Sequence, residues 1–112
     1  MQIINQSREH TKMEIYSLTQ DCEIKSMKTL EEEPFKVNSW IIYKDIDKDG
    51  KEIELLSMST NLGVYAAQSK TFIESFLNIN ELFGNEPYML QVVHAKSKAD
   101  RDYINCRAVP VQ

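Results

Sequence analysis

The sequence predicts a mainly β protein, built as a small five-stranded barrel with one helix between its third and fourth strands. Three observations predict this fold class. An Asp49-Gly50 turn separates two apolar, β-rich runs, which is the strongest short-range signal for a β-hairpin. One stretch with the helical spacing of apolar residues follows these strands, and two further strand-like runs come after it.

The size and composition of the chain fit one soluble globular domain. Its 112 residues are enough to bury a single core, and a charged share of 27% is ordinary for such a domain. No apolar run approaches the roughly 20 residues that cross a membrane, and the first residues do not form a signal peptide. We expect a cytoplasmic protein, in which Cys22 and Cys106 are free thiols.

The chain begins with a polar stretch. We expect residues 1–12 to form a flexible arm, followed by a single domain over residues 13–112. The alternation of apolar and polar residues from Met13 to Leu18 predicts a short strand. Asp21 is a suitable cap for a short helix that ends before Pro34. The alternative is an irregular segment whose apolar side chains pack onto the core.

The strands on either side of the Asp49-Gly50 turn begin a three-stranded meander. The first is predicted over Phe35 to Asp45, the second over Glu52 to Thr60 and the third over Val64 to Gln68. The first strand has apolar residues at both odd and even positions, so both of its faces are expected to be covered. Such a strand is central in a two-layer packing or belongs to a barrel whose outer face binds a ligand.

The turn sequence from Asp45 to Gly50 is similar to the start of a calcium-binding loop. In such loops the twelfth position is a glutamate that holds the ion through both carboxylate oxygens, and here that position is Leu56. We therefore expect a solvated hairpin tip at this turn, and no metal or other cofactor.

A helix and two strands complete the predicted fold. Ser69 is a suitable N-cap for a helix that Gly84 ends. The apolar stripe of this helix contains Phe72, Ile73, Phe76 and Leu77. Two strands follow, Tyr88 to Lys96 and Asp102 to Val109, joined by a charged loop. Three strands, a helix and two strands form the order of an OB-fold barrel. An open five-stranded α+β sheet with the helix on one face is equally compatible with this order.

Aromatic and basic residues alternate on the predicted first and last strands. Barrels of this type commonly bind oligonucleotides, through rings on which bases stack and cations that follow the phosphates. Trp40 lies between Lys36 and Lys44 on one face, and Tyr103 shares a face with Arg107. The predicted DNA-binding residues are Lys36, Trp40, Tyr43, Lys44, Tyr65, Lys96, Lys98, Arg101, Tyr103 and Arg107.

The formal net charge of −4 argues mildly against a nucleic-acid partner, because such domains are usually basic. Many of the acidic residues, however, cluster at positions 31–33 and 45–54, away from the predicted cations. An acidic total is therefore compatible with one basic groove.

We expect no enzymatic activity. His10 lies in the predicted arm, and His94 lies on a strand without a nucleophile as an evident partner. The sequence contains none of the phosphate-binding, dinucleotide-binding, zinc-protease or serine-hydrolase motifs.

Several short motifs give the chain a family resemblance from Tyr16 to Val109. It resembles the small single-stranded DNA-binding proteins encoded by tailed phages and mobile elements of Gram-positive bacteria. The segment Gly63 to Phe72, which reads Gly-Val-Tyr-Ala-Ala-Gln-Ser-Lys-Thr-Phe, is the most telling motif. The others are Tyr16 to Gln20, Trp40 to Tyr43, Val92-Val93 and Ser97-Lys98.

The resemblance implies a protein that coats and protects single-stranded DNA during phage or mobile-element replication. Binding would be independent of sequence and would weaken with salt, and copies of the protein would associate on the DNA inside the bacterial host cell. No membrane partner is expected. The alternative is a protein-interaction module of a phage or plasmid that docks on a host protein, which fits the acidic balance better.

Overall fold

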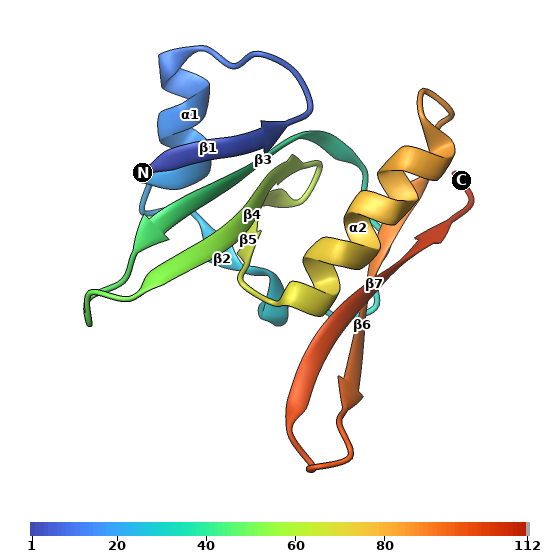
Figure 1. Cartoon of the computed structure of the whole chain (residues 1–112). Helices are drawn as coiled ribbons and strands as arrows, with labels where there is room; N and C mark the ends of the chain where they lie inside the picture. The colour runs from blue at the N-terminus through green and yellow to red at the C-terminus, as the bar shows by residue number, and fades with distance from the viewer. Residues whose placement is uncertain (112) are drawn as a thin grey trace.

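A five-stranded sheet and a two-stranded hairpin form the body of this mainly β protein (Figure 1). The computed structural model describes residues 1–111. The sheet has the order β1 (Gln2–Gln6), β3 (Val37–Ile46), β4 (Glu52–Thr60), β5 (Gly63–Ala67) and β2 (Lys25–Ser26). The hairpin consists of β6 (Met89–Lys96) and β7 (Asp102–Val109).

Two α-helices accompany the strands. Helix α1 (Lys12–Thr19) lies between β1 and β2 in the chain, and α2 (Lys70–Phe83) lies between β5 and β6. A short 3₁₀ helix, η1 (Met27–Thr29), follows β2 directly. Figure 1 shows α1 beside β1 and α2 beside the hairpin. None of the helices within residues 1–111 is long and apolar enough to cross a membrane.

The predicted meander is confirmed as β3, β4 and β5, which pair in antiparallel order. Its first turn is built by Asp47, whose carboxylate oxygen accepts the backbone N–H groups of Asp49 and Lys51. Gly50 adopts a positive φ of 78° there, which a residue without a Cβ adopts at little cost. The turn is a solvated hairpin tip, and no group of residues suited to hold a metal ion occurs within residues 1–111.

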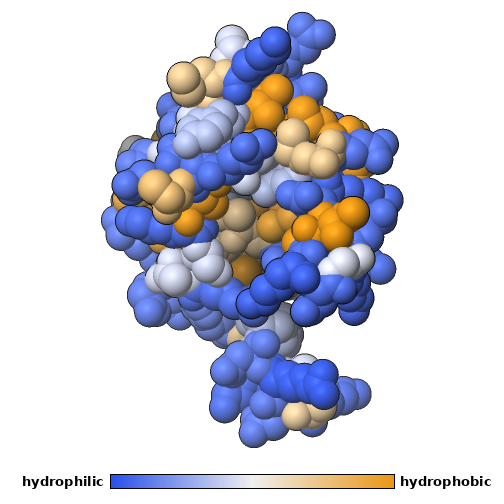
Figure 2. Space-filling view, turned by 90° about the vertical axis from the view of Figure 1, so that its left-hand side faces the viewer, coloured by the Kyte–Doolittle hydropathy of each residue, from blue (hydrophilic) through white to orange (hydrophobic). Residues whose placement is uncertain are grey.

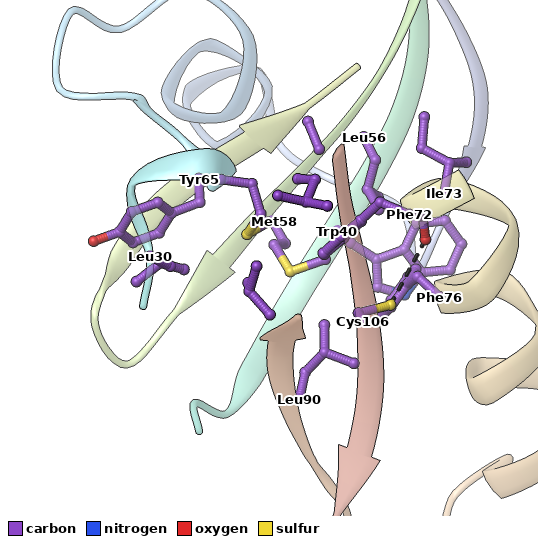
Figure 3. Packing of buried hydrophobic residues seen from close by; sticks show 14 of the residues in the cluster. Leu30, Trp40, Leu56, Met58, Tyr65, Phe72, Ile73, Phe76, Leu90 and Cys106 are labelled. Atoms are coloured by element: carbon purple, nitrogen blue, oxygen red, sulfur yellow. Dashed lines mark hydrogen bonds between the residues drawn. The ribbon is translucent and has the colours of Figure 1, made fainter. Parts of the chain in front are cut away.

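Both faces of β3 are buried, as predicted. On one face Trp40 and Ile42 belong to the main core, which contains Phe72 and Phe76 of α2. Figure 3 shows this core, in which the rings of Trp40 and Phe76 meet edge to face at 5.4 Å. On the other face Ile41 and Tyr43 pack in a smaller cluster with Leu18 of α1. Strand β3 is therefore the central strand of a layered packing.

The start of the chain differs from its prediction. We predicted a flexible arm over residues 1–12, whereas residues 2–6 form β1 and pair with β3. The short strand predicted from Met13 to Leu18 is wrong, because these residues belong to α1. Thr11 caps this helix by accepting the N–H of Glu14, and the Glu14 carboxylate accepts the N–H of Thr11 in return. This reciprocal cap outweighs the weak alternation of the following residues.

The predicted OB-fold barrel is not closed. The sheet and the hairpin are joined by one backbone pair, Phe35 and Leu90. The N–H of each residue donates to the carbonyl oxygen of the other, with N···O distances of 2.8 and 2.9 Å. Within residues 1–111, β5 pairs with β4 and with the two-residue strand β2, and no ladder joins it to β7. The predicted single helix between the third and fourth of five strands is also wrong, since there are two helices and α2 follows β5. The result is an open sheet with a gap on the side of β7.

Candidate functional site

An open groove lies where the sheet does not close onto the hairpin. A cavity of about 610 Å³ is bounded by β2, the end of β5 and the start of β7. A second cavity of about 460 Å³ is bounded by η1 and the two strands of the hairpin. The two share Lys28, Asp102, Tyr103 and Ile104 in their walls, so they form one continuous depression. We call it the β5–β7 groove.

Figure 2 shows the side of the molecule that carries the β3–β4 turn. A hollow with apolar side chains at its bottom and polar side chains around it lies above a projecting lower end, which is the tip of the hairpin. The apolar lining of the β5–β7 groove consists of Ile24, Leu55, Ala66, Ala67 and Ile104. A surface of this kind accepts flat apolar groups at its bottom and charged groups at its rim.

Three lysines from separate segments lie along the groove. Lys25 is placed by the parallel pairing of β2 with β5, in which it is opposite Tyr65. Lys28 lies on η1, whose start is fixed by the Ser26 hydroxyl that accepts the Lys28 N–H. Lys96 comes from the last position of β6. All three residues are exposed, so the groove has a positive rim on both of its sides.

Tyr103 is the aromatic residue of the groove. The alternation of β7 buries Ile104 and Cys106 and turns Tyr103 outward, where 37% of it is exposed. It belongs to the walls of both cavities, so its ring lies at the middle of the groove. A partly exposed ring at this place offers a face for stacking with another planar group.

Two hydrogen bonds hold the segment that carries Lys28 against the hairpin. Nε2 of His94 on β6 lies 2.6 Å from the carbonyl oxygen of Leu30, and the side-chain amide of Gln91 donates to the carbonyl oxygen of Glu32. A carbonyl oxygen only accepts, so Nε2 of His94 carries the proton in this contact. These contacts set the distance between the two walls of the groove.

Acidic groups are few in this groove. Asp102 is the acidic residue among those that line the two cavities. Asp100 lies 3.7 Å from Lys96, but the two side chains are 86% and 66% exposed, so water screens the pair and its net contribution is small. The remaining rim charge is positive.

Some of the predicted DNA-binding residues meet in this groove and others do not. Tyr103 and Lys96 line it. Lys98 and Arg101 are exposed in the loop at the tip of the hairpin, next to Lys96 in the chain. Arg107 is exposed on β7 opposite Gln91, outside both cavities.

Three predicted stacking residues are buried. Trp40, Tyr43 and Tyr65 are 5%, 4% and 7% exposed, because both faces of the sheet are covered. Their ring faces are occupied by protein, so the expectation that bases stack on them is corrected. Burial raises the pKa of Tyr43, and the charge of Asp45 raises it further.

The two predicted lysines of the first long strand also lie away from the groove. Lys44 is next to Glu52, with 3.4 Å between Nζ and a carboxylate oxygen. Lys36 lines a third cavity together with Trp40. Sequence reasoning missed Lys25 and Lys28, because their position depends on a two-residue parallel strand that leaves no periodic signal.

No family model, curated protein or solved structure matches this chain. The resemblance to small phage single-stranded DNA-binding proteins therefore rests on its motifs, and the chemistry of the groove is the basis for a functional proposal.

Proposed function

We propose that this protein binds single-stranded DNA without sequence specificity and coats it during phage or mobile-element replication. One observation carries the proposal. The partly exposed ring of Tyr103 lies in one cavity with Lys28 and Lys96, which come from two other segments of the chain. An unpaired base can stack on the ring while its phosphates approach the lysines, and a paired base offers no free face of this kind.

The apolar lining of the groove supports single strands rather than duplexes. Ile24, Leu55 and Ile104 provide surface that the bases of a single strand can cover, whereas a duplex presents only its charged backbone and groove edges. Stacking on an aromatic side chain contributes about 1–3 kcal/mol per base and is independent of base identity. The expected binding is therefore tolerant of sequence.

The net charge of −4 does not oppose this site, because the acidic residues concentrate elsewhere. The run Glu31 to Glu33 and the β3–β4 turn, with Asp45, Asp47 and Asp49, lie outside the cavities of the groove. The lysines of the groove attract the phosphates of a DNA strand. The acidic residues outside the groove repel them, which limits the orientations in which the DNA binds.

The alternative function, docking on a host protein, is favoured by a different surface. Met13 and Tyr16 on α1 are 71% and 48% exposed and lie three residues apart, on one side of the helix. Capture of a partner that survives nuclease treatment, and that is lost when Tyr16 is replaced by Ser, would favour this alternative.

A titration tests the proposed function. A fluorescently labelled oligo-dT is titrated with the protein at two salt concentrations, and a duplex of the same length is titrated in parallel. We expect saturable binding of the single strand, weaker binding at the higher salt, and weaker binding of the duplex. Equal affinity for duplex and single strand, or no binding at low salt, would overturn the proposal.

A further inference from the structure

A separate cavity lies at the other end of the sheet. It has a volume of about 570 Å³ and is bounded by the start of β3, the end of α2 and the start of β6. It shares no lining residue with the β5–β7 groove. Its lining includes Trp40, Tyr88 and three asparagines, and the ring of Tyr88 packs against that of Phe83. Cavities of this size, with aromatic walls and a few polar groups, are typical of small-ligand sites.

Trp40 is held rigidly at the wall of this cavity. Its backbone N–H donates to the Ser7 hydroxyl at 3.1 Å, and its carbonyl oxygen accepts the Ser7 N–H at 3.0 Å. The ring of Phe76 fixes the indole from the side. These hydrogen bonds use the backbone of Trp40, so they hold the residue in place without involving its indole.

The asparagine side chains add amide donors and acceptors. Asn61 uses its carbonyl oxygen to accept the backbone N–H of Lys36 at 2.7 Å, which fixes the orientation of its amide; its NH₂ group has no partner within residues 1–111. Asn38 and Asn80 make no side-chain hydrogen bond with the rest of residues 1–111, and both line the cavity. An asparagine amide presents a donor beside an acceptor, which matches the edge of an adenine base.

We propose that this cavity binds the adenine base of a nucleotide, either free or within a DNA strand. In this proposal the amides of Asn38 and Asn80 read the edge of the base, Tyr88 packs against it and Lys36 attracts its phosphate, with Glu86 as the acidic residue of the lining. Single bases are commonly recognised in this way, by amide contacts to the base edge and contact with an aromatic ring. If the base belongs to a strand, the inference rests on the proposed function and adds a base preference to it.

The test uses the single tryptophan of the chain, because Trp40 lies at this cavity and not at the groove. The protein is titrated with dAMP and with dTMP, and the tryptophan emission is followed. We expect a saturable change in emission with dAMP, and roughly tenfold weaker binding of dTMP, as one bidentate amide contact provides. An emission that neither nucleotide changes, or that both change at equal concentration, overturns the proposal.

A matched pair of variants on α2 locates the ligand. Asn80→Ala removes a lining amide and should weaken dAMP binding about tenfold, whereas Asn78→Ala removes an exposed amide of the same helix outside the cavity and should not. Both replacements favour the helix, so circular dichroism should show that both variants fold. If Asn80→Ala binds dAMP as tightly as Asn78→Ala, the cavity is not the site.

Labelled oligo-dA and oligo-dT separate this proposal from the proposed function. Tyr103→Ala should weaken both oligonucleotides, because Tyr103 lies in the groove. Asn80→Ala should weaken dAMP binding in either case. Of the two oligonucleotides, it should weaken only oligo-dA if the cavity takes bases of the strand, and neither if the cavity takes only a free nucleotide. If both oligonucleotides bind tightly and Asn80→Ala changes the affinity of neither oligo-dA nor dAMP, the proposed function of the groove stands and the proposed adenine site is overturned.

Discussion

His94 and Leu30 meet across the β5–β7 groove, with 2.6 Å between Nε2 of the histidine and the carbonyl oxygen of the leucine. This contact ties the segment that carries Lys28 to β6. The placement of Lys28 in the groove therefore depends on His94, which lines the same cavity as Lys28 and Tyr103.

His94→Ala should loosen one wall of the groove. The loss of one hydrogen bond should reduce the free energy of unfolding by about 1 kcal/mol, and the freed Lys28 segment should weaken the binding of oligo-dT. Urea denaturation and titration with labelled oligo-dT measure the two effects. His94→Gln keeps an N–H donor near the same place and should recover part of both. Unchanged oligo-dT affinity in His94→Ala would show that the contact does not organise the groove.

Tyr103→Ala should weaken oligo-dT binding by about 1–3 kcal/mol, which corresponds to roughly 5- to 150-fold in affinity. Tyr103→Phe keeps the ring and should bind like the original protein. Because 37% of Tyr103 is exposed, we expect little change in stability from either variant. Fluorescence anisotropy of a labelled oligo-dT gives the affinities. If the alanine and phenylalanine variants bind equally well, stacking on Tyr103 does not contribute.

The lysines of the groove should determine the salt dependence of DNA binding. Lys28→Ala and Lys96→Ala should each reduce the slope of log affinity against log salt concentration by about 0.7, the value for one contact to a single strand. Lys48→Ala changes an exposed lysine at the β3–β4 turn, outside the groove, and serves as the matched control. The slopes come from titrations at four or more salt concentrations. If Lys48→Ala reduces the slope as much as Lys28→Ala and Lys96→Ala do, the DNA does not bind in the groove.

The cap of α1 should depend on pH. The hydrogen bond from the Arg8 side chain, followed by that from the Thr11 backbone N–H, lowers the pKa of Glu14 to about 2. This value lies below the roughly 4.3 of an unfolded chain, so the ionised carboxylate stabilises the folded state above that pH. The contribution disappears as the pH falls toward 2.

Glu14→Gln can still cap the helix but does not titrate. The stability difference between the original protein and Glu14→Gln should therefore shrink as the pH falls from about 4.3. Salt should reduce this difference at neutral pH, because the Arg8–Glu14 pair is exposed. Thermal unfolding of both proteins across this pH range measures the change. A difference that stays constant over the range would contradict the assignment of the pKa to this cap.

The two cysteines should react differently with a thiol reagent. Burial raises the pKa of the Cys106 thiol to about 12, and the thiol donates to the carbonyl oxygen of Phe72. Cys22 is exposed. In the folded protein at mildly alkaline pH, Cys22 should react and Cys106 should be protected, and both should react in denaturant. Fast labelling of Cys106 in the folded protein, seen by peptide mass spectrometry, would show that the core opens readily.

The elements that could be predicted from the sequence are those with local signals. The Asp49-Gly50 turn, the Ser69 cap and the alternation of Asp102 to Val109 each involve neighbouring residues, and they fix the meander, α2 and the last strand. The reciprocal cap of Thr11 and Glu14 was also a local signal, but the alternation from Met13 to Leu18 suggested a strand.

The parts that could not be predicted depend on contacts between distant segments. The apolar residues at both odd and even positions of β3 indicate that both faces are covered, but not that α1 covers Tyr43 or that α2 covers Trp40. Whether a ring on such a strand is open to a ligand is decided by these covering elements. The same holds for Lys25 and Lys28, whose place in the groove follows from the pairing of β2 with β5.

The three hydrogen bonds between Ser7 and Trp40 have a practical consequence for shortened versions of the chain. Removing the first seven residues would remove β1, which pairs with one edge of β3. The long apolar strand β3 would then have unpaired N–H and C=O groups along that edge. Bare strand edges recruit other chains, so such a deletion should produce aggregates rather than a smaller folded protein. Affinity tags and fusion partners are therefore better attached at the C-terminus than at the N-terminus.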